Sequence, residues 1–171
     1  MNETLKTLET RRSIRKYRPE QITKEELDAV LRAGVYAPSG MNLQSTVLVA
    51  VQNKEDRDAL MLLNKRISGR DHDPYYGAPT IVVALAEADS RFGVQDASLA
   101  IGNMCNAAAA LGLGSCWIHR AKEVFETAEG KALLKKWGLD GDYIGVGHCI
   151  LGYPAETPEA KERRAGRIVI R

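Results

Sequence analysis

The longest apolar pattern in the chain lies between residues 93 and 119, where small and aliphatic side chains recur at helical spacing. A helix that is apolar on most of its circumference is expected to be buried on most of it, and the segment is too long for a strand. Gly112 and Gly114 follow at the usual place for a helix end, and the run SCWI (115–118) predicts a short strand. We therefore expect a central helix, although an ordinary core helix with no site attached explains the pattern equally well. Its two apolar stripes are Ala97, Ile101, Met104, Ala108 and Leu111, and Ala100, Ala107 and Ala110.

Shorter segments with helical spacing lie on both sides of this helix. The best marked of them begins at Thr23, because Thr23 followed by Glu26 fits a capping box, and it ends before Pro38. We expect a surface helix over residues 54–67. The other predicted helices span residues 2–10, 120–127 and 129–137.

Short apolar runs predict the strands. Those at residues 46–51 and 80–86 are apolar enough to be buried on both faces, and a third covers 143–152. Residues 153–171 are rich in proline and charge and fit an extended C-terminal arm that ends in a strand, RIVIR. At 171 residues, without a repeat or linker, the chain is expected to be one domain over 1–171, with helices on both faces of a mixed sheet.

Composition excludes several classes of protein. Hydrophobic residues make up 44% and charged residues 27%, as in ordinary globular proteins, and a net charge of +2 is too small to argue for nucleic acid. No apolar run approaches the ~20 residues of a membrane helix, and the N-terminus has no signal-peptide core, so we expect no membrane partner. Cys105, Cys116 and Cys149 lack CxxC spacing, which favours a reducing cytoplasm and buried thiols.

A basic segment follows the first predicted helix. Arg11, Arg12 and Arg15 surround Ser13, and a second cluster of Lys161, Arg163 and Arg164 lies near the C-terminus. Arginine presents a planar fork of donors that matches phosphate or carboxylate. The segment is therefore either an anion clamp or a solvated basic loop.

A pair of amides follows a turn at Pro38, Ser39 and Gly40. Asn42 and Gln44 lie two residues apart, so in an extended segment both amides point the same way. Amides offer donors and acceptors to a flat heterocycle, or they simply cap backbone groups.

The histidines are less informative. His72 between two aspartates is a weak metal candidate, and His148 inside an apolar run is expected to be a satisfied core histidine.

Familiar catalytic motifs are absent from the sequence. It contains no GxGxxG fingerprint, no phosphate loop, no GxSxG elbow and no HExxH pair. Two basic clusters and an amide pair would instead suit a phosphate tail at one end and a polar flat ring at the other. A cofactor that carries its own redox chemistry requires mainly placement and electrostatics from the protein.

The stretch RRSIRKYRPEQITKEELDAVLRAGVYAPSGMNLQ (11–44) resembles the N-terminal signature of the nitroreductase family of FMN-dependent oxidoreductases. That signature has an Arg-x-Ser-x-Arg/Lys block, a helix and a Pro-Ser-x-x-Asn-x-Gln block. DASLAIGNMCNAAAALGLGSCWI (96–118) resembles the family's central helix and next strand, and GYP followed by KxR resembles its C-terminal arm. The chain is short and is similar to the compact bacterial members.

The resemblance implies an α+β fold with a mixed, mainly antiparallel central sheet flanked by helices. It implies a homodimer that exchanges C-terminal arms and holds two FMN at its interface. Chemistry would occur on FMN without a catalytic side chain. NADH or NADPH would reduce it in a ping-pong mechanism, and nitroaromatics, quinones or related small-molecule electron acceptors would reoxidise it.

The resemblance also implies the cofactor-binding residues. Arg11, Arg12, Ser13 and Arg15 would hold the phosphate and ribityl chain, with Lys161, Arg163 and possible substitute Arg164 completing the phosphate site. Pro38, Ser39 and Gly40 would come from the partner subunit, and Asn42 would face the ring with Gln44 nearby. Trp117, Ile118 and His119 would line the ring's far edge, where many members have instead a turn rich in Pro or Gly.

Two rival functions remain open at this point. A flavin-dependent dehalogenase or flavin-cleaving enzyme would share the fold, and a substrate-covering lid insertion would favour it. A non-enzymatic module that binds nucleotides or RNA would use the same basic segments. Aromatic residues are only 6%, however, and no RNA-binding signature is visible.

Overall fold

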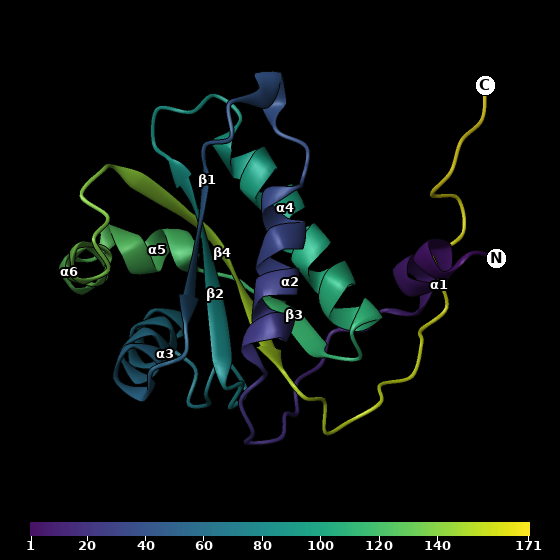
Figure 1. The fold of residues 1–171 in the computed structure, drawn as a ribbon, viewed down its shortest axis with the longest axis horizontal. Helices are drawn as coiled ribbons and strands as arrows, with labels where there is room; N and C mark the ends of the chain where they lie inside the picture. Colours follow the sequence, from purple (N-terminus) through teal and green to yellow (C-terminus); the bar gives the residue numbers. More distant parts are fainter.

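A four-stranded antiparallel sheet forms the centre of the protein (Figure 1). The computed structural model describes all 171 residues. The strand order is β1-β2-β4-β3, and every neighbouring pair is antiparallel. The only parallel pairing is a single bridge between Ser13 and Ser115, so the expected mixed sheet is antiparallel in all its strands. The strands are β1 (Thr46–Val51), β2 (Thr80–Glu87), β3 (Gly114–Ile118) and β4 (Tyr143–Gly152).

Helices cover both faces of the sheet, as the alternation of elements predicts (Figure 1). On one face lie α2 (Lys24–Val35) and α4 (Gly93–Ala110). On the other lie α3 (Lys54–Ser68), α5 (Ala121–Glu126) and α6 (Ala128–Lys136). A short helix, α1 (Glu3–Thr10), lies to one side, near the end of α4.

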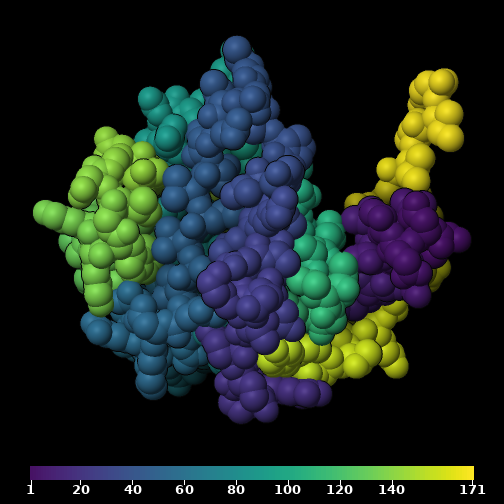
Figure 2. Space-filling view, in the orientation of Figure 1, coloured from purple at the N-terminus to yellow at the C-terminus, as the bar shows by residue number.

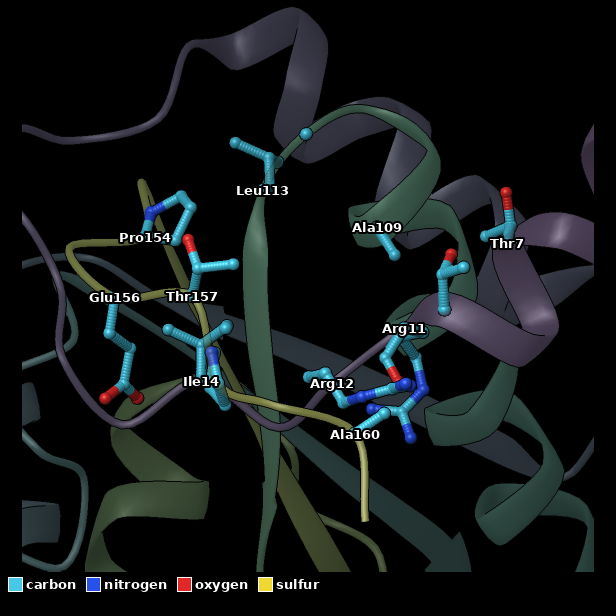
Figure 3. Close-up of a pocket in the computed structure, with 13 residues that line it drawn as sticks. Thr7, Arg11, Arg12, Ile14, Ala109, Leu113, Pro154, Glu156, Thr157 and Ala160 are labelled. Carbon is cyan, nitrogen blue, oxygen red and sulfur yellow. The ribbon is translucent and has the colours of Figure 1, made fainter. Parts of the chain in front are cut away.

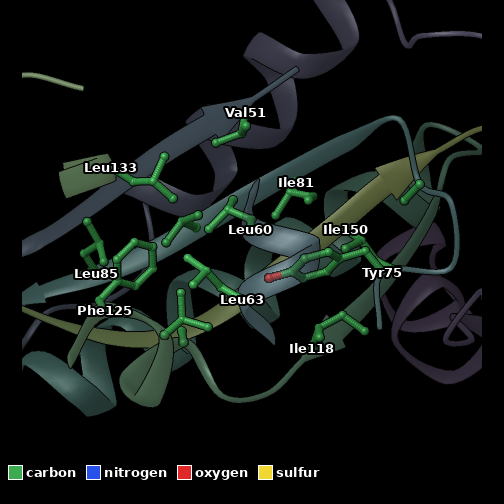
Figure 4. Packing of buried hydrophobic residues seen from close by; sticks show 14 of the residues in the cluster. Val51, Leu60, Leu63, Tyr75, Ile81, Leu85, Ile118, Phe125, Leu133 and Ile150 are labelled. Atoms are coloured by element: carbon green, nitrogen blue, oxygen red, sulfur yellow. The ribbon is translucent and has the colours of Figure 1, made fainter. Parts of the chain in front are cut away.

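The central strand β2 separates two hydrophobic cores. Ile81, Val83 and Leu85 pack toward α3 and α5, in the cluster shown in Figure 4, and Val82 and Ala84 pack toward α2 and α4. Successive side chains of a strand point to opposite faces, so a strand covered on both faces is apolar throughout. The prediction that residues 80–86 are buried on both faces is confirmed.

The same prediction for β1 is wrong. Only Val51 of this strand is fully buried, and its other residues are half-buried. The reason is position, because β1 is an edge strand of the sheet and the helices cover it incompletely.

The central helix is also less buried than its composition suggests. Ala97, Ile101, Met104 and Ala108 are buried, but Leu111 is 44% exposed, and Leu99 is 48% exposed. The apolar pattern predicts the helix correctly, but in the single chain one side of α4 faces outward.

The C-terminal arm leaves the body of the molecule (Figure 2). Residues 159–171 are exposed throughout, and the predicted terminal strand over 167–171 does not form, because no strand of the same chain lies beside it. Ile168 and Ile170 are 85% and 90% exposed.

Two further properties of the chain concern membranes and metals. None of the helices combines the length and the apolar character that a membrane crossing demands. His72 and its neighbouring aspartates do not gather into a group that could hold a metal ion.

Candidate functional site

The basic segment after α1 runs extended beside β3. Ile14 donates its N–H to the carbonyl of Ser115 at 2.9 Å, and its side chain is buried. A Cβ at Gly114 would lie 3.0 Å from the Ile14 side chain, so glycine at this position permits the close approach. Backbone pairing and one apolar side chain therefore fix the segment. Arg12 also donates from Nη1 to the carbonyls of Glu9 at 2.9 Å and Arg11 at 2.8 Å, which leaves its other donors available.

Arg11 and Arg12 line a cavity of about 340 Å³ between α1, the end of α4 and the start of the arm. Figure 3 shows both arginines close to Ala160, with Glu156 on the far side of Ile14. The Glu156 carboxylate accepts the backbone N–H of Arg15 at 2.5 Å. No carboxylate pairs with either guanidinium, so this cavity is a suitable place for an anion.

The amide pair lies in a second cavity, of about 520 Å³, at the other end of α4. Asn42 and Gln44 have φ of 56° and 53°, so the extended conformation expected for this segment is wrong. The tight turn nevertheless brings the two amides together, because Gln44 Nε2 donates to Asn42 Oδ1 at 3.1 Å. Ser39 supports the turn, since its Oγ accepts the N–H of Gln44 at 2.8 Å.

A buried carboxylate anchors this turn to α4. Both oxygens of Asp96 accept the N–H of Gly40, at 3.0 and 3.1 Å, and Asp96 is only 5% exposed. A Cβ at Gly40 would lie 2.5 Å from Phe92. The sequence analysis missed Asp96, and no local signal reveals its role, because it accepts a distant N–H rather than capping its own helix.

A third cavity, of about 150 Å³, lies at the end of β3. Trp117 is 38% exposed, Ile118 is buried and His119 is exposed. The guanidinium of Arg15 lies 5.9 Å from the centre of the Tyr76 ring. Arg15 therefore lines the same cavity as Trp117, Ile118 and His119, the three residues expected at the ring edge. The loop that contains Tyr76 also lines this cavity.

A buried polar network lies beneath this third cavity. Asn64 Nδ2 donates to the carbonyl of His119 at 3.0 Å and to the Tyr75 hydroxyl at 3.3 Å, and that hydroxyl contacts His148 Nε2 at 3.3 Å. Burial lowers the pKa of His148 to about 4. Asn64 Oδ1 and His148 Nδ1 have no partner, so the histidine expected to be satisfied is only half satisfied.

The three cysteines are free and buried, as expected. Cys105 Sγ and Cys149 Sγ lie 3.8 Å apart. The hydrogen bond with Cys149 lowers the pKa of Cys105 to about 7, and nearby Arg11 contributes to that shift.

The expected site residues lie in separate regions of the single chain. Arg11 and Arg12 share a cavity with the arm, whereas the amide pair lies at the other end of α4. Ala100 lines one cavity and Ala109 the other, which corresponds to roughly 14 Å along the helix. Lys161, Arg163 and Arg164 are exposed on the arm, where the two arginines line a surface hollow of their own. One chain therefore does not bring the expected site residues together.

Comparison with known proteins shows a family to which this chain is similar. The model of the nitroreductase family matches residues 8–153. A protein of Archaeoglobus fulgidus, provisionally named an NADH dehydrogenase/NAD(P)H nitroreductase, is 32% identical over 95% of this chain and 91% of its own length. An FMN reductase [NAD(P)H] of Bacillus subtilis is 27% identical over 95% of this chain and 70% of its own.

Solved structures give the same result for the fold. A Bacteroides fragilis nitroreductase with bound FMN is 36% identical, with a TM-score of 0.87 over 99% of both chains. A Desulfitobacterium hafniense nitroreductase with bound FMN is 25% identical, with a TM-score of 0.89 over 99% of this chain and 98% of that one.

Proposed function

This chain belongs to the nitroreductase family, and we propose that it is an FMN-dependent oxidoreductase that uses NADH or NADPH to reduce small-molecule electron acceptors. The observation that carries the proposal is the match, over 99% of both chains, to a nitroreductase with bound FMN. Two relatives support the same conclusion, one named an FMN reductase [NAD(P)H] and the other an NADPH-flavin oxidoreductase. The acceptors we propose are nitroaromatics, quinones and related compounds.

The cavity beside α1 fits the phosphate end of FMN. A phosphate dianion requires cations and hydrogen-bond donors, and Arg11 and Arg12 supply them from a segment fixed by its backbone. Ser13 lies between them and Ile14 in the chain but does not line this cavity in the single chain, so we propose that its hydroxyl joins the site in the dimer. Lys161 and Arg163 of the arm, with Arg164 as a possible substitute, would complete this phosphate site.

The ring end of FMN would contact residues of both subunits. Arg15, Trp117, Ile118 and His119 gather at the end of β3, and they would border one edge of the flavin. The remaining contacts would come from the turn of the partner subunit, namely Pro38, Ser39, Gly40, Asn42 and Gln44.

A homodimer joins the two halves of the site. In a twofold pair each chain presents the same patch, so the Arg11 end of one α4 can meet the Asn42 end of the other. The outward side of α4 carries Leu99 at 48% exposure, and apolar side chains near both ends are similarly uncovered. We propose that this face is the dimer interface, and that residues 153–171 form an arm exchanged between the subunits of a single-domain protein.

The protein's part in the reaction is placement and electrostatics. FMN, when bound, supplies a ring that accepts a hydride and passes electrons on. Arg11 and Arg12 would hold the phosphate, and Arg15 would place a positive charge beside the ring. We propose a ping-pong order, in which NAD(P)H leaves before the acceptor enters the same space.

Flavin retention tests the proposal. We expect the purified protein to be yellow, to release FMN on denaturation and to oxidise NADH or NADPH when an acceptor is present. Arg11→Ala should lower the flavin-to-protein ratio by tenfold or more, because a hydrogen-bonded ion pair with phosphate is lost. Absorbance after gel filtration, with chromatography of the released flavin, measures this ratio.

Arg66→Ala is the matched control, since Arg66 lies on α3, on the face of the sheet away from α4, and its exposed guanidinium pairs only with Glu129. This variant should retain flavin fully. Colourless protein that shifts RNA on a gel would favour the nucleotide- or RNA-binding module and sink the proposal. A dehalogenase or flavin-cleaving activity would instead appear as halide release or flavin breakdown by yellow protein.

A further inference from the structure

The loop between α3 and β2 forms one wall of the third cavity, and the proposed function gives its residues no role. Its residues Arg70, His72 and Tyr76 line the cavity opposite Trp117 and His119. The loop is folded by Asp73, whose carboxylate accepts the N–H groups of Tyr75 at 2.7 Å and Gly77 at 2.8 Å.

Three arginines line this cavity, and none of their guanidiniums forms a salt bridge. They are Arg15, Arg70 and Arg120, and the cavity that they line is called here the cationic pocket. His72 and His119 line it as well.

The carboxylates on the neighbouring segments do not form ion pairs with these arginines. Asp71 pairs with Lys65 at 2.8 Å, Asp73 accepts N–H groups of its own loop, and Glu156 accepts the backbone N–H of Arg15. Guanidinium forks match carboxylate and phosphate oxygens, so unpaired arginines around one cavity favour the binding of an anion.

The cationic pocket is separate from the cavity that fits the FMN phosphate. Arg11 and Arg12 line that first cavity, and neither of them lines the cationic pocket. Arg15 lies four residues beyond Arg11 along an extended segment, roughly 13 Å away. An anion in the cationic pocket is therefore at the ring end of the proposed flavin site.

We propose that the cationic pocket binds an anionic group on the small molecule that exchanges electrons with the flavin. The inference rests on the proposed function and names the substrate class of the same site. Arg70 is its specificity-determining residue, because it lies on the loop wall and has no other role. Two sources carry the required chemistry, namely a carboxylated electron acceptor and the 2′-phosphate that distinguishes NADPH from NADH.

Binding of matched small molecules provides the first test. Benzoate and benzamide differ in charge but hardly in shape, and both can be titrated into the flavin-loaded protein and followed by the flavin absorbance. We expect benzoate to bind more tightly than benzamide, and Arg70→Gln to weaken benzoate by about tenfold while changing benzamide little. Arg66→Gln, on the same side of the sheet but paired with Glu129, should change neither.

Kinetics distinguish the two sources. We compare kcat/KM, per bound flavin, for 4-nitrobenzoate against 4-nitrobenzamide and for NADPH against NADH. A fall of about tenfold in the first ratio on Arg70→Gln assigns the pocket to the acceptor, and a fall in the second assigns it to the reductant.

The possible failures can be told apart. Protein that retains no flavin overturns the proposed function and this inference together. Flavin-loaded protein in which Arg70→Gln leaves the benzoate affinity and both ratios unchanged overturns this inference alone. A fall of equal size in Arg66→Gln also overturns it, because the effect is then general surface charge.

Discussion

His148 shows how much one buried side chain depends on its surroundings. Its ring is fully buried on β4, one nitrogen contacts the Tyr75 hydroxyl, and the other has no partner. Charging such a ring removes it from water without an opposing charge, so the neutral form is favoured in the folded state. This is why burial lowers the pKa of His148 to about 4.

The pH dependence of stability should reveal this histidine. Between about pH 6.5 and 4 the unfolded chain binds a proton at His148 that the folded chain does not bind. The free energy of unfolding should therefore fall by about 1.4 kcal/mol per pH unit as the pH drops through this window. Urea unfolding at a series of pH values measures the slope. His148→Gln should reduce the slope by about that amount, whatever its effect at pH 8, and equal slopes would contradict the assignment.

Element boundaries could be predicted well because local chemistry determines them. The helix beginning after Thr23 shows the capping box that the sequence predicts, with Thr23 Oγ1 accepting the N–H of Glu26 and the Glu26 carboxylate accepting the N–H of Thr23. The run at 46–51 forms a strand of those bounds. The burial of β1 could not be predicted, because the sequence does not state which strand lies at the edge of the sheet.

The conformation of the turn at 38–44 could not be predicted either, because a residue far away in the sequence holds it. Pro, Ser and Gly predict a turn, but not the positive φ values of Met41, Asn42 and Gln44. The turn is anchored by Asp96, which accepts the N–H of Gly40 from 56 residues further along the chain. A contact of that range leaves no periodic signal in the sequence. Residue type alone predicted that the two amides lie together, but not the geometry that brings them together.

Asp96→Ala tests this long-range anchor. The half-buried N–H of Gly40 would lose its acceptor, which should cost about 1–3 kcal/mol in the free energy of unfolding and loosen the turn. Asp96→Asn retains one acceptor oxygen and should cost less. Urea unfolding of both variants gives the comparison, and an Ala variant as stable as the parent would show that the contact does not hold the turn.

At the scale of the whole molecule, the proposed site depends on an arrangement that one chain does not contain. Residue types alone predicted the two basic clusters as candidate anion-binding groups. Their convergence was not, because the arm of one chain leaves its own body, and the amide turn and Arg11 lie at opposite ends of α4. The detached arm and the separation of the two cavities along α4 are both explained if a second copy of the chain supplies the other half of the proposed site.

Removing residues 159–171 tests this arrangement directly. Ile168, Val169 and Ile170 are 85%, 68% and 90% exposed in the single chain, so an arm that stays on its own body contributes almost nothing to stability. If the arm crosses to a partner, each of these side chains gains about 1.5–3 kcal/mol on burial, and their loss should raise the dimer dissociation constant by well over tenfold. Sedimentation velocity over a dilution series measures the constant, and absorbance measures the flavin that remains.

A double variant separates the two contributions of the arm. Lys161→Gln with Arg163→Gln removes charge but keeps the apolar end, so it should lower flavin retention and leave the dimer intact. The truncated chain should lose both properties. A truncated chain that stays dimeric and yellow would mean that the arm has no partner across the interface. The phosphate site would then have to be completed within one subunit, by Arg11 and Arg12 alone.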